Sequence, residues 1–184
     1  MSKQRTVLVT GGSRGIGASI AKHFAEKGDR IAVHYSSNGD LAKEVMASLP
    51  GSGHMVAQAD LRDADAIKVM VDAVAKEFGH IDILVNNAGI TRDMTFKKMD
   101  KPSWDAVLKT NLDSVFNMTK PVIDSMAERG WGRVINVSSV NGQKGAFGQT
   151  NYSAAKAGMH GFSMALAQEL ATKGVTVNTV SPGY

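Results

Sequence analysis

The sequence of 184 residues contains no cysteine. This absence excludes disulfide bonds, metal sites built on thiolates and a cysteine nucleophile. Long hydrophobic runs are also lacking: no apolar stretch reaches the roughly 18 residues that cross a bilayer, and the polar start of the chain does not resemble a signal peptide. We therefore expect a cytoplasmic protein that makes no contact with a membrane.

Charge of one sign is not concentrated anywhere in the chain. The 21 Lys and Arg residues are scattered, and the formal net charge is only +4. This distribution does not indicate nucleic-acid binding. The apolar fraction of 43% and the charged fraction of 21% are ordinary for a globular protein. The length suits one domain over residues 1–184, and we expect no metal site in it.

Short β-branched stretches alternate with longer helical patterns along the chain. Six stretches are predicted as strands: residues 6–10, 31–35, 54–59, 81–86, 133–138 and 175–180. Helices are predicted over residues 18–27, 40–49, 64–78, 103–128 and 152–173, the last after a glycine-rich loop at 140–148. The alternation predicts an α/β fold with a doubly wound parallel sheet of six strands, of the Rossmann type.

A glycine-rich turn, residues 10–17 (TGGSRGIG), follows the first strand and opens the first helix. Glycines permit a tight turn and let the backbone approach a pyrophosphate, which binds the N–H groups at the positive end of a helix. Taken alone, a turn with three glycines could be only a strand–helix turn. After a first buried strand in a six-strand α/β pattern, it predicts a dinucleotide site.

The choice between NAD(H) and NADP(H) depends on the end of the second strand. An acidic residue there commonly binds the ribose 2′-hydroxyl, but no carboxylate follows Tyr35 and Ser36 until Asp40. Arg14, within the glycine turn, is suited to a 2′-phosphate through its planar guanidinium. These features favour NADP(H); the alternative is that Arg14 points into solvent.

Tyr152 and Lys156 lie four positions apart in a predicted helix and so share one face. A phenol with a free pKa of about 10 is a poor acid at neutral pH, but a neighbouring ammonium lowers that pKa. The pair is therefore a candidate for proton transfer. Taken alone, it is also typical of an ordinary helix surface.

The motifs together resemble the classical short-chain dehydrogenase/reductase family. The resemblance rests on residues 10–17, 86–89 (NNAG), Asn111, Ser139, Tyr152 with Lys156, and Pro182 with Gly183, all in family order. Within the family, residues 89–93 (GITRD), 131–133 and 140–153 are similar to acetoacetyl-CoA reductases. That similarity implies NADPH-dependent reduction of acetoacetyl-CoA to (R)-3-hydroxybutyryl-CoA, which supplies polyhydroxybutyrate synthesis. Reduction of 3-oxoacyl-acyl-carrier-protein is the alternative.

The resemblance also implies roles for the catalytic residues. Tyr152 would protonate the ketone oxygen, while Lys156 would lower the pKa of Tyr152 and hydrogen-bond the nicotinamide ribose. Ser139, selected over Ser138 by its spacing from Tyr152, would hydrogen-bond the developing oxyanion. Asn111 would hold a water that connects Lys156 to solvent, unless it only bends its helix.

Cofactor and substrate residues are carried over in the same way. The implied cofactor-binding residues are Gly11, Ser13, Arg14, Gly15, Ile16, Gly17, Tyr35, Ser36, Asp60, Leu61, Asn87, Ala88, Gly89, Tyr152, Lys156, Pro182 and Gly183. Asp60 and Leu61 would flank the adenine. Asp93, Phe147 and Gln149 would contribute to the substrate pocket, although Asp93 as a helix cap and Phe147 as a loop anchor are alternatives.

Family members continue beyond the Pro-Gly pair with further helices and a seventh strand, so we expect a shortened domain here. The sixth strand would then be a sheet edge, and activity would be impaired because the substrate region is incomplete. We expect the segment between Ser139 and Tyr152 to lack packing partners and to be poorly ordered. A homodimer is expected through helices 103–128 and 152–173. The alternative to an active reductase is an NADP-binding remnant without turnover.

Overall fold

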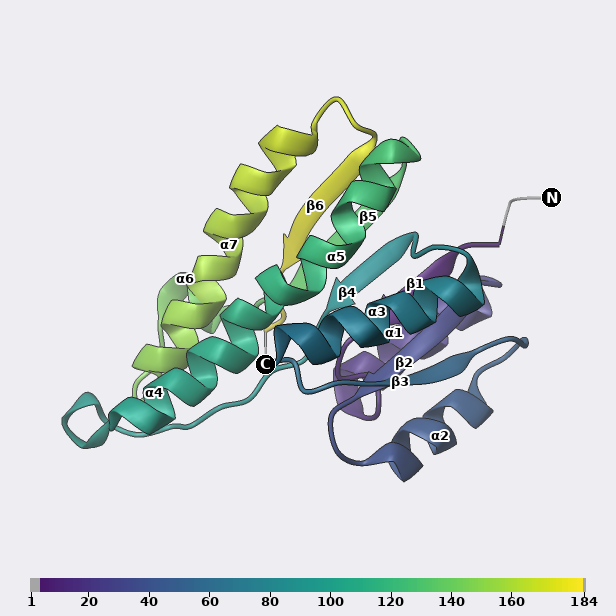
Figure 1. The fold of residues 1–184 in the computed structure, drawn as a ribbon. Coiled ribbons are helices and arrows are strands. Elements are labelled where there is room, and N and C mark those ends of the chain that lie inside the picture. Colours follow the sequence, from purple (N-terminus) through teal and green to yellow (C-terminus); the bar gives the residue numbers. More distant parts are fainter. Residues whose placement is uncertain (1–3, 184) are drawn as a thin grey trace.

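The computed structural model describes residues 4–183 as an open parallel sheet flanked by helices (Figure 1). The strands are β1 (Thr6–Val9), β2 (Arg30–Tyr35), β3 (Met55–Gln58), β4 (Ile83–Asn86), β5 (Gly132–Val137) and β6 (Val175–Val180). The α-helices are α1 (Gly15–Glu26), α2 (Gly39–Ser48), α3 (Ala64–Phe78), α4 (Lys101–Leu108), α5 (Ser114–Glu128), α6 (Asn141–Lys144) and α7 (Thr150–Leu170). The predicted fold and all six strands are confirmed, and no strand end differs from its prediction by more than two residues.

The strand order is β3-β2-β1-β4-β5-β6, and every neighbouring pair is parallel. Within the described residues β6 is an edge strand, as predicted. The order reverses between β1 and β4, where Val7 is paired with Ile31 on one side and Ile83 on the other. In such sheets ligands bind at the reversal point, beyond the carboxyl ends of the strands.

Two apolar layers hold the helices against the sheet. Because strand side chains alternate between faces, Leu8 packs with helices α3, α5 and α7, whereas Val7 and Val9 pack with α1 and α2. These three side chains of β1 are fully buried. This burial on both faces explains why the central strand is continuously apolar rather than alternating.

The prediction of a single helix over residues 103–128 is wrong in one respect, because the helix there is not regular. A π-helical turn, η2 (Lys109–Asp113), separates α4 from α5. The turn contains Asn111, whose side chain hydrogen-bonds the backbone of Ile90. Such π turns insert one extra residue into a helix. Here the turn interrupts the regular backbone hydrogen bonds of the helix and directs the side-chain amide of Asn111 into the protein.

The segment between Ser139 and Tyr152 is also not the partnerless loop that we expected. Residues 141–144 form the short helix α6, which packs against α7. The approach is so close that a Cβ on Gly142 would lie 2.8 Å from the backbone carbon of Lys156. Because Gly142 has no side chain, α6 can approach α7 this closely, and the segment is packed against that helix.

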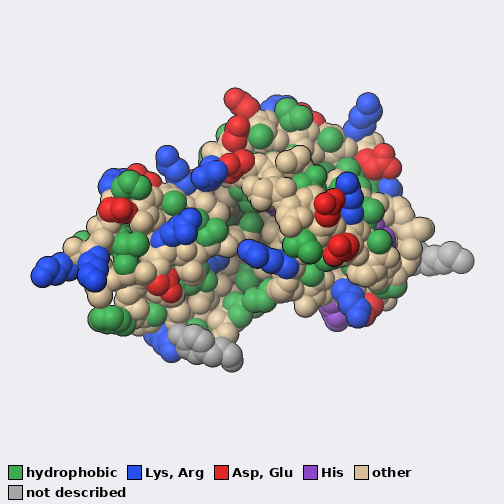
Figure 2. Space-filling model, turned by 90° about the horizontal axis from the view of Figure 1, so that it is seen from below, with side chains coloured by type: hydrophobic (Ala, Val, Ile, Leu, Met, Phe, Trp, Pro, Cys, Tyr) green, Lys and Arg blue, Asp and Glu red, His purple; other side chains and the backbone are tan. Residues whose placement is uncertain are grey.

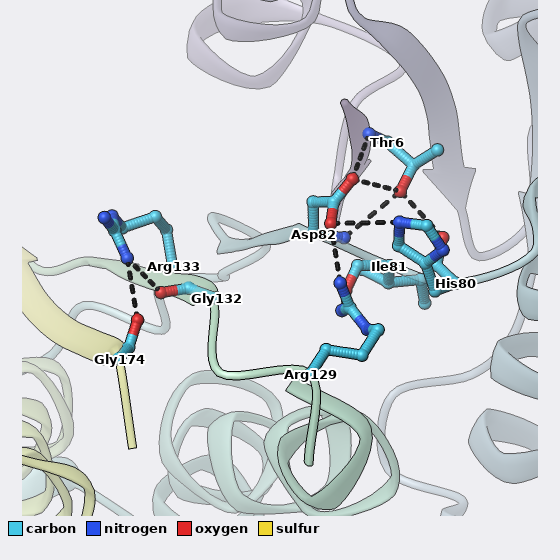
Figure 3. Close-up of polar contacts among 8 residues, drawn as sticks. All are labelled: Thr6, His80, Ile81, Asp82, Arg129, Gly132, Arg133 and Gly174. Atoms are coloured by element: carbon cyan, nitrogen blue, oxygen red, sulfur yellow. Dashed lines mark hydrogen bonds and ion pairs between the residues drawn. The ribbon is translucent and has the colours of Figure 1, made fainter. Parts of the chain in front are cut away.

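A polar cluster around Asp82 ties elements together at the amino ends of the strands (Figure 3). The carboxylate of Asp82 accepts hydrogen bonds from the backbone N–H of Thr6 at 3.0 Å and from Arg129 Nη1 at 2.8 Å. His80 Nε2 lies 3.1 Å from the same carboxylate. The cluster joins the starts of β1 and β4 to the end of α5, at the opposite end of the sheet from the reversal-point crevice.

Among residues 4–183, no helix is both long enough and apolar enough to cross a membrane.

Candidate functional site

The glycine turn between β1 and α1 has geometry that only glycine satisfies. Gly11 adopts a positive φ of 62°, and a Cβ on Gly17 would lie 2.2 Å from the carbonyl oxygen of Gly11. Arg14 occupies the N-cap of α1, and no side chain in the described part of the chain caps the helix there. The uncapped N–H groups and the positive helix end suit a phosphate group.

Thr10 and Asn87 fasten this turn to the end of β4. Thr10 Oγ1 accepts hydrogen bonds from the backbone N–H groups of Asn87 at 2.9 Å and Ala88 at 3.0 Å. In return, Asn87 Nδ2 donates to the carbonyl of Thr10 at 2.9 Å. The two strand ends on either side of the reversal point are therefore held together by side chains as well as by the sheet.

A cavity of about 670 Å³ opens beside the turn at the carboxyl end of the sheet. Figure 2 views this end of the molecule and shows its surface hollowed near the middle. All predicted cofactor residues from Gly11 to Gly89 line this cavity. The structure thus brings together the turn, the ends of β2 and β3, and the start of the segment after β4.

A second cavity, of about 520 Å³, adjoins the first. Its lining includes Ser139, Tyr152, Lys156, Pro182 and Gly183. Residues that line both cavities are Arg14, Ile16, Asn87, Gly89 and Ile90. We call the first the phosphate-turn cavity and the second the tyrosine cavity; their shared wall makes one continuous site.

Lys156 is an unusual lysine because only 3% of its surface is exposed. Its Nζ donates a hydrogen bond to the carbonyl of Val137 at 2.7 Å and lies 5.7 Å from the centre of the Tyr152 ring. Burial lowers the pKa of Lys156 from 10.5 to about 8. The ammonium is thus held beside the tyrosine at a pKa close to neutral pH.

The two adjacent serines have different environments. Ser138 is buried, and its hydroxyl donates to the carbonyl of Lys156 at 2.8 Å, which fixes α7 to β5. Ser139 lines the tyrosine cavity, and its Oγ accepts the backbone N–H of Asn141 at 3.1 Å. As an acceptor in this bond, the Ser139 hydroxyl keeps its own hydrogen for another partner.

Asn111 is fully buried and does not itself line the tyrosine cavity. Its amide pairs with the backbone N–H and carbonyl of Ile90, both at 2.8 Å. It nevertheless lies next to Lys156, because a Cβ on Gly89 would stand 2.4 Å from Asn111 Oδ1 and 3.5 Å from Lys156 Nζ. Gly89 is required where these two side chains converge.

The three predicted substrate residues lie outside the tyrosine-cavity lining. Gln149 links two loops, since it donates to Asp93 at 2.8 Å and accepts from Asn141 at 2.9 Å. Asp93 is therefore the partner of Gln149 and not a helix cap. Phe147 is 93% exposed at the surface of the loop before α7.

Comparison with known proteins decides the family. The short chain dehydrogenase family profile matches residues 5–184. The chain belongs to the short-chain dehydrogenase family. The chain is accordingly an oxidoreductase that uses a nicotinamide cofactor.

Relatives within the family are similar over almost the whole chain. An acetoacetyl-CoA reductase from Cupriavidus necator is 55% identical over 98% of this chain and 74% of its own length, and one from Allochromatium vinosum shows the same values. A 3-oxoacyl-acyl-carrier-protein reductase from Staphylococcus aureus is 44% identical over 100% of this chain and 76% of its own length.

Several residues that line the cavities of this short-chain dehydrogenase were not predicted from the sequence. In the phosphate-turn cavity they are His34, Ser37, Asn38, Leu41, Arg62, Ile90 and Thr110. Arg62 forms a two-pronged ion pair with Asp60, which lowers the pKa of that carboxyl to about 2. Most of these residues follow the carboxyl ends of strands, and that position is the signal by which they are recognisable.

Proposed function

We propose that this chain reduces the 3-oxo group of acetoacetyl-CoA to give (R)-3-hydroxybutyryl-CoA, with NADPH as reductant. The observation that carries the proposal is the 55% identity to acetoacetyl-CoA reductases over 98% of the chain. The lower identity of 44% to an acyl-carrier-protein reductase makes that substrate the second candidate.

The proposed roles follow from the groups that line the tyrosine cavity. Bound NADPH supplies the hydride. Tyr152 Oη donates its proton to the ketone oxygen, and the nearby Lys156 ammonium favours the resulting phenolate. Ser139 Oγ donates its hydrogen to the oxygen as negative charge develops there. Asn111 fixes the backbone at Ile90 beside Lys156 and binds the water through which the pair regains a proton.

The preference for NADPH over NADH is proposed from the end of β2. Arg14, Tyr35 and Ser36 line the phosphate-turn cavity, and the first carboxylate after them, Asp40, pairs with Lys43 at 3.8 Å on the surface. A 2′-phosphate at this position would meet a guanidinium and hydroxyl groups, and the end of β2 offers no carboxylate to repel it.

The proposed substrate contacts are Asp93, Phe147 and Gln149. The bond between Asp93 and Gln149 fixes two loops near the reaction site. The exposed ring of Phe147 supplies an apolar surface on the second loop. An acyl-CoA thioester approaching between these loops would meet both a polar and an apolar contact.

The direct test is an assay of NADPH oxidation in the presence of acetoacetyl-CoA, measured as the loss of NADPH absorbance. Turnover by the wild-type chain, and its loss in Tyr152→Phe with NADPH binding retained, is the expected result. NADPH binding without turnover would identify a non-catalytic binding protein instead. Faster turnover of an acetoacetyl-acyl-carrier-protein thioester would transfer the proposal to the second candidate substrate.

We also propose that the chain forms a homodimer through helices 103–128 and 152–173. Large apolar side chains on these helices face solvent, with Phe116 of α5 58% exposed and Met164 of α7 63% exposed. Exposed apolar side chains on neighbouring helices are typical of subunit contacts. Light scattering on a size-exclusion column would give a dimer mass; a monomer would refute the proposal.

A further inference from the structure

His34 lies at the end of β2, directly beneath the glycine turn. It is only 1% exposed, although it contributes to the lining of the phosphate-turn cavity. The backbone N–H of Gly11 donates to its Nδ1 at 3.0 Å, and its Nε2 lies 3.0 Å from the carbonyl oxygen of Ala59. One ring therefore connects the turn after β1 with the end of β3.

The two partners determine the form of the ring. A backbone N–H only donates, so Nδ1 must carry no hydrogen; a carbonyl only accepts, so Nε2 must carry one. His34 is thus the neutral Nε2–H tautomer. Burial agrees with this assignment, since it lowers the pKa of His34 to about 4.

The backbone of His34 holds the same turn. The N–H of Gly12 donates to the carbonyl of His34 at 2.9 Å. On its other side the turn contacts the segment after β4, because a Cβ on Gly11 would lie 3.0 Å from the Cα of Ala88. Gly11, in its left-handed conformation, is therefore held between the His34 ring and the segment after β4.

We propose that His34 is a positioning residue for dinucleotide binding, which clamps the phosphate turn by accepting the Gly11 N–H and donating to Ala59. The proposal rests on the proposed binding of NADPH in this cavity. By occupying the N–H of Gly11, the ring leaves the pyrophosphate to the N–H groups farther along the turn, at the start of α1. Loss of the clamp raises the Kd for NADPH, because the turn must then be ordered at the expense of binding.

The clamp lies apart from the proton-transfer groups. Tyr152 and Lys156 line the tyrosine cavity, whose walls do not include His34. Removing the ring should therefore raise the Kd and KM for NADPH while the kcat at saturating NADPH changes little. A role in general stability alone would not separate these constants.

The chain offers a matched control in His54. Its Nδ1 accepts the backbone N–H of Ile31 at 3.1 Å, and its Nε2 lies 3.0 Å from the carbonyl of Pro50. It thus joins β2 to a neighbouring loop in the same way, but it lines neither the phosphate-turn cavity nor the tyrosine cavity. His54→Leu reports the effect of losing such a pair of bonds away from the site.

The experiment compares NADPH titrations, steady-state kinetics and thermal unfolding for the wild type, H34L, H34N, H34Q and H54L. H34L should raise the Kd for NADPH by about 10-fold or more, since it removes one buried and one partly buried hydrogen bond. H34N should recover most of the affinity for NADPH, because the asparagine Oδ1 can accept the Gly11 N–H. H34Q should not recover it, because the longer glutamine amide reaches the Ala59 carbonyl instead. H54L should leave the Kd within about 2-fold.

Each outcome bears on the proposal. A folded H34L with wild-type affinity, or H34L and H54L equally weakened, would overturn the clamp while leaving the proposed function intact. If H34L does not fold, equal affinities of H34N and H34Q would overturn it in the same way. A wild-type chain that does not bind NADPH would contradict the proposed function itself, and the clamp with it.

Discussion

Replacement of Lys156 by Met should make the protein more stable while it abolishes turnover. Only 3% of Lys156 is exposed, and its ammonium pairs with no carboxylate in the described residues. Methionine has a similar volume and needs no solvation, so it removes the cost of keeping a charge in this position.

The magnitude follows from the pKa of Lys156, which burial lowers from 10.5 to about 8. Below pH 8 both the folded and the unfolded chain carry the proton, so the full difference opposes folding, by about 3 kcal/mol at 1.36 kcal/mol for each pKa unit. Methionine leaves the Val137 carbonyl without its donor, which costs about 1 kcal/mol. The net gain of about 2 kcal/mol corresponds to a Tm increase of about 4–8 °C for a chain of this size.

The pH dependence of stability independently tests whether the charge of Lys156 opposes folding. As pH rises from 8 to 10.5 the folded chain loses the Lys156 proton while the unfolded chain keeps it, so wild-type stability rises in that window. The Met variant lacks this contribution, and its advantage should shrink to near zero by about pH 10. Thermal and urea unfolding without cofactor, at pH 7 and pH 10, measure both effects. A Met variant less stable than the wild type at pH 7, or a difference that does not change with pH, would refute the reasoning.

Three further predictions concern other parts of the molecule. Gly17→Ala places a Cβ 2.2 Å from the Gly11 carbonyl oxygen, so the turn must shift and NADPH affinity should fall by about 100-fold; unchanged affinity in a titration would contradict this. Asp82→Asn leaves Arg129, 28% exposed, without its anionic partner and should lower the unfolding free energy by about 2 kcal/mol in urea, whereas a neutral result would show that the cluster does not stabilise the fold. Arg14→Leu should reduce the ratio of NADPH to NADH affinity by about 10-fold or more, and an unchanged ratio would place the 2′-phosphate elsewhere.

Much of the fold and the glycine turn could be predicted because their requirements are local. The fully apolar β1 indicates a strand buried on both faces, and the positive φ of 62° at Gly11 permits few other residues. Tyr152 and Lys156 share a helix face by spacing alone. Family resemblance then related Ser139 to them, although thirteen positions separate it from Tyr152.

Features that depend on distant backbone partners could not be predicted. The His34 ring bonds Gly11 and Ala59, which are 23 and 25 positions away, and nothing local distinguishes such a histidine from any other strand residue. The π turn around Asn111 likewise depends on the backbone of Ile90, 21 positions earlier. Helical periodicity predicts that a helix exists, but it does not reveal where an inward amide interrupts it.

We propose that Tyr152 and Lys156 serve an NADPH-dependent reduction of acetoacetyl-CoA. This proposal is tested most directly by mixing the purified chain with both compounds and following NADPH absorbance, with Tyr152→Phe measured in parallel. We expect steady NADPH oxidation and formation of (R)-3-hydroxybutyryl-CoA by the wild type, and neither by the variant. A folded wild-type chain that binds NADPH but forms no product, or a Phe variant as active as the wild type, would contradict it.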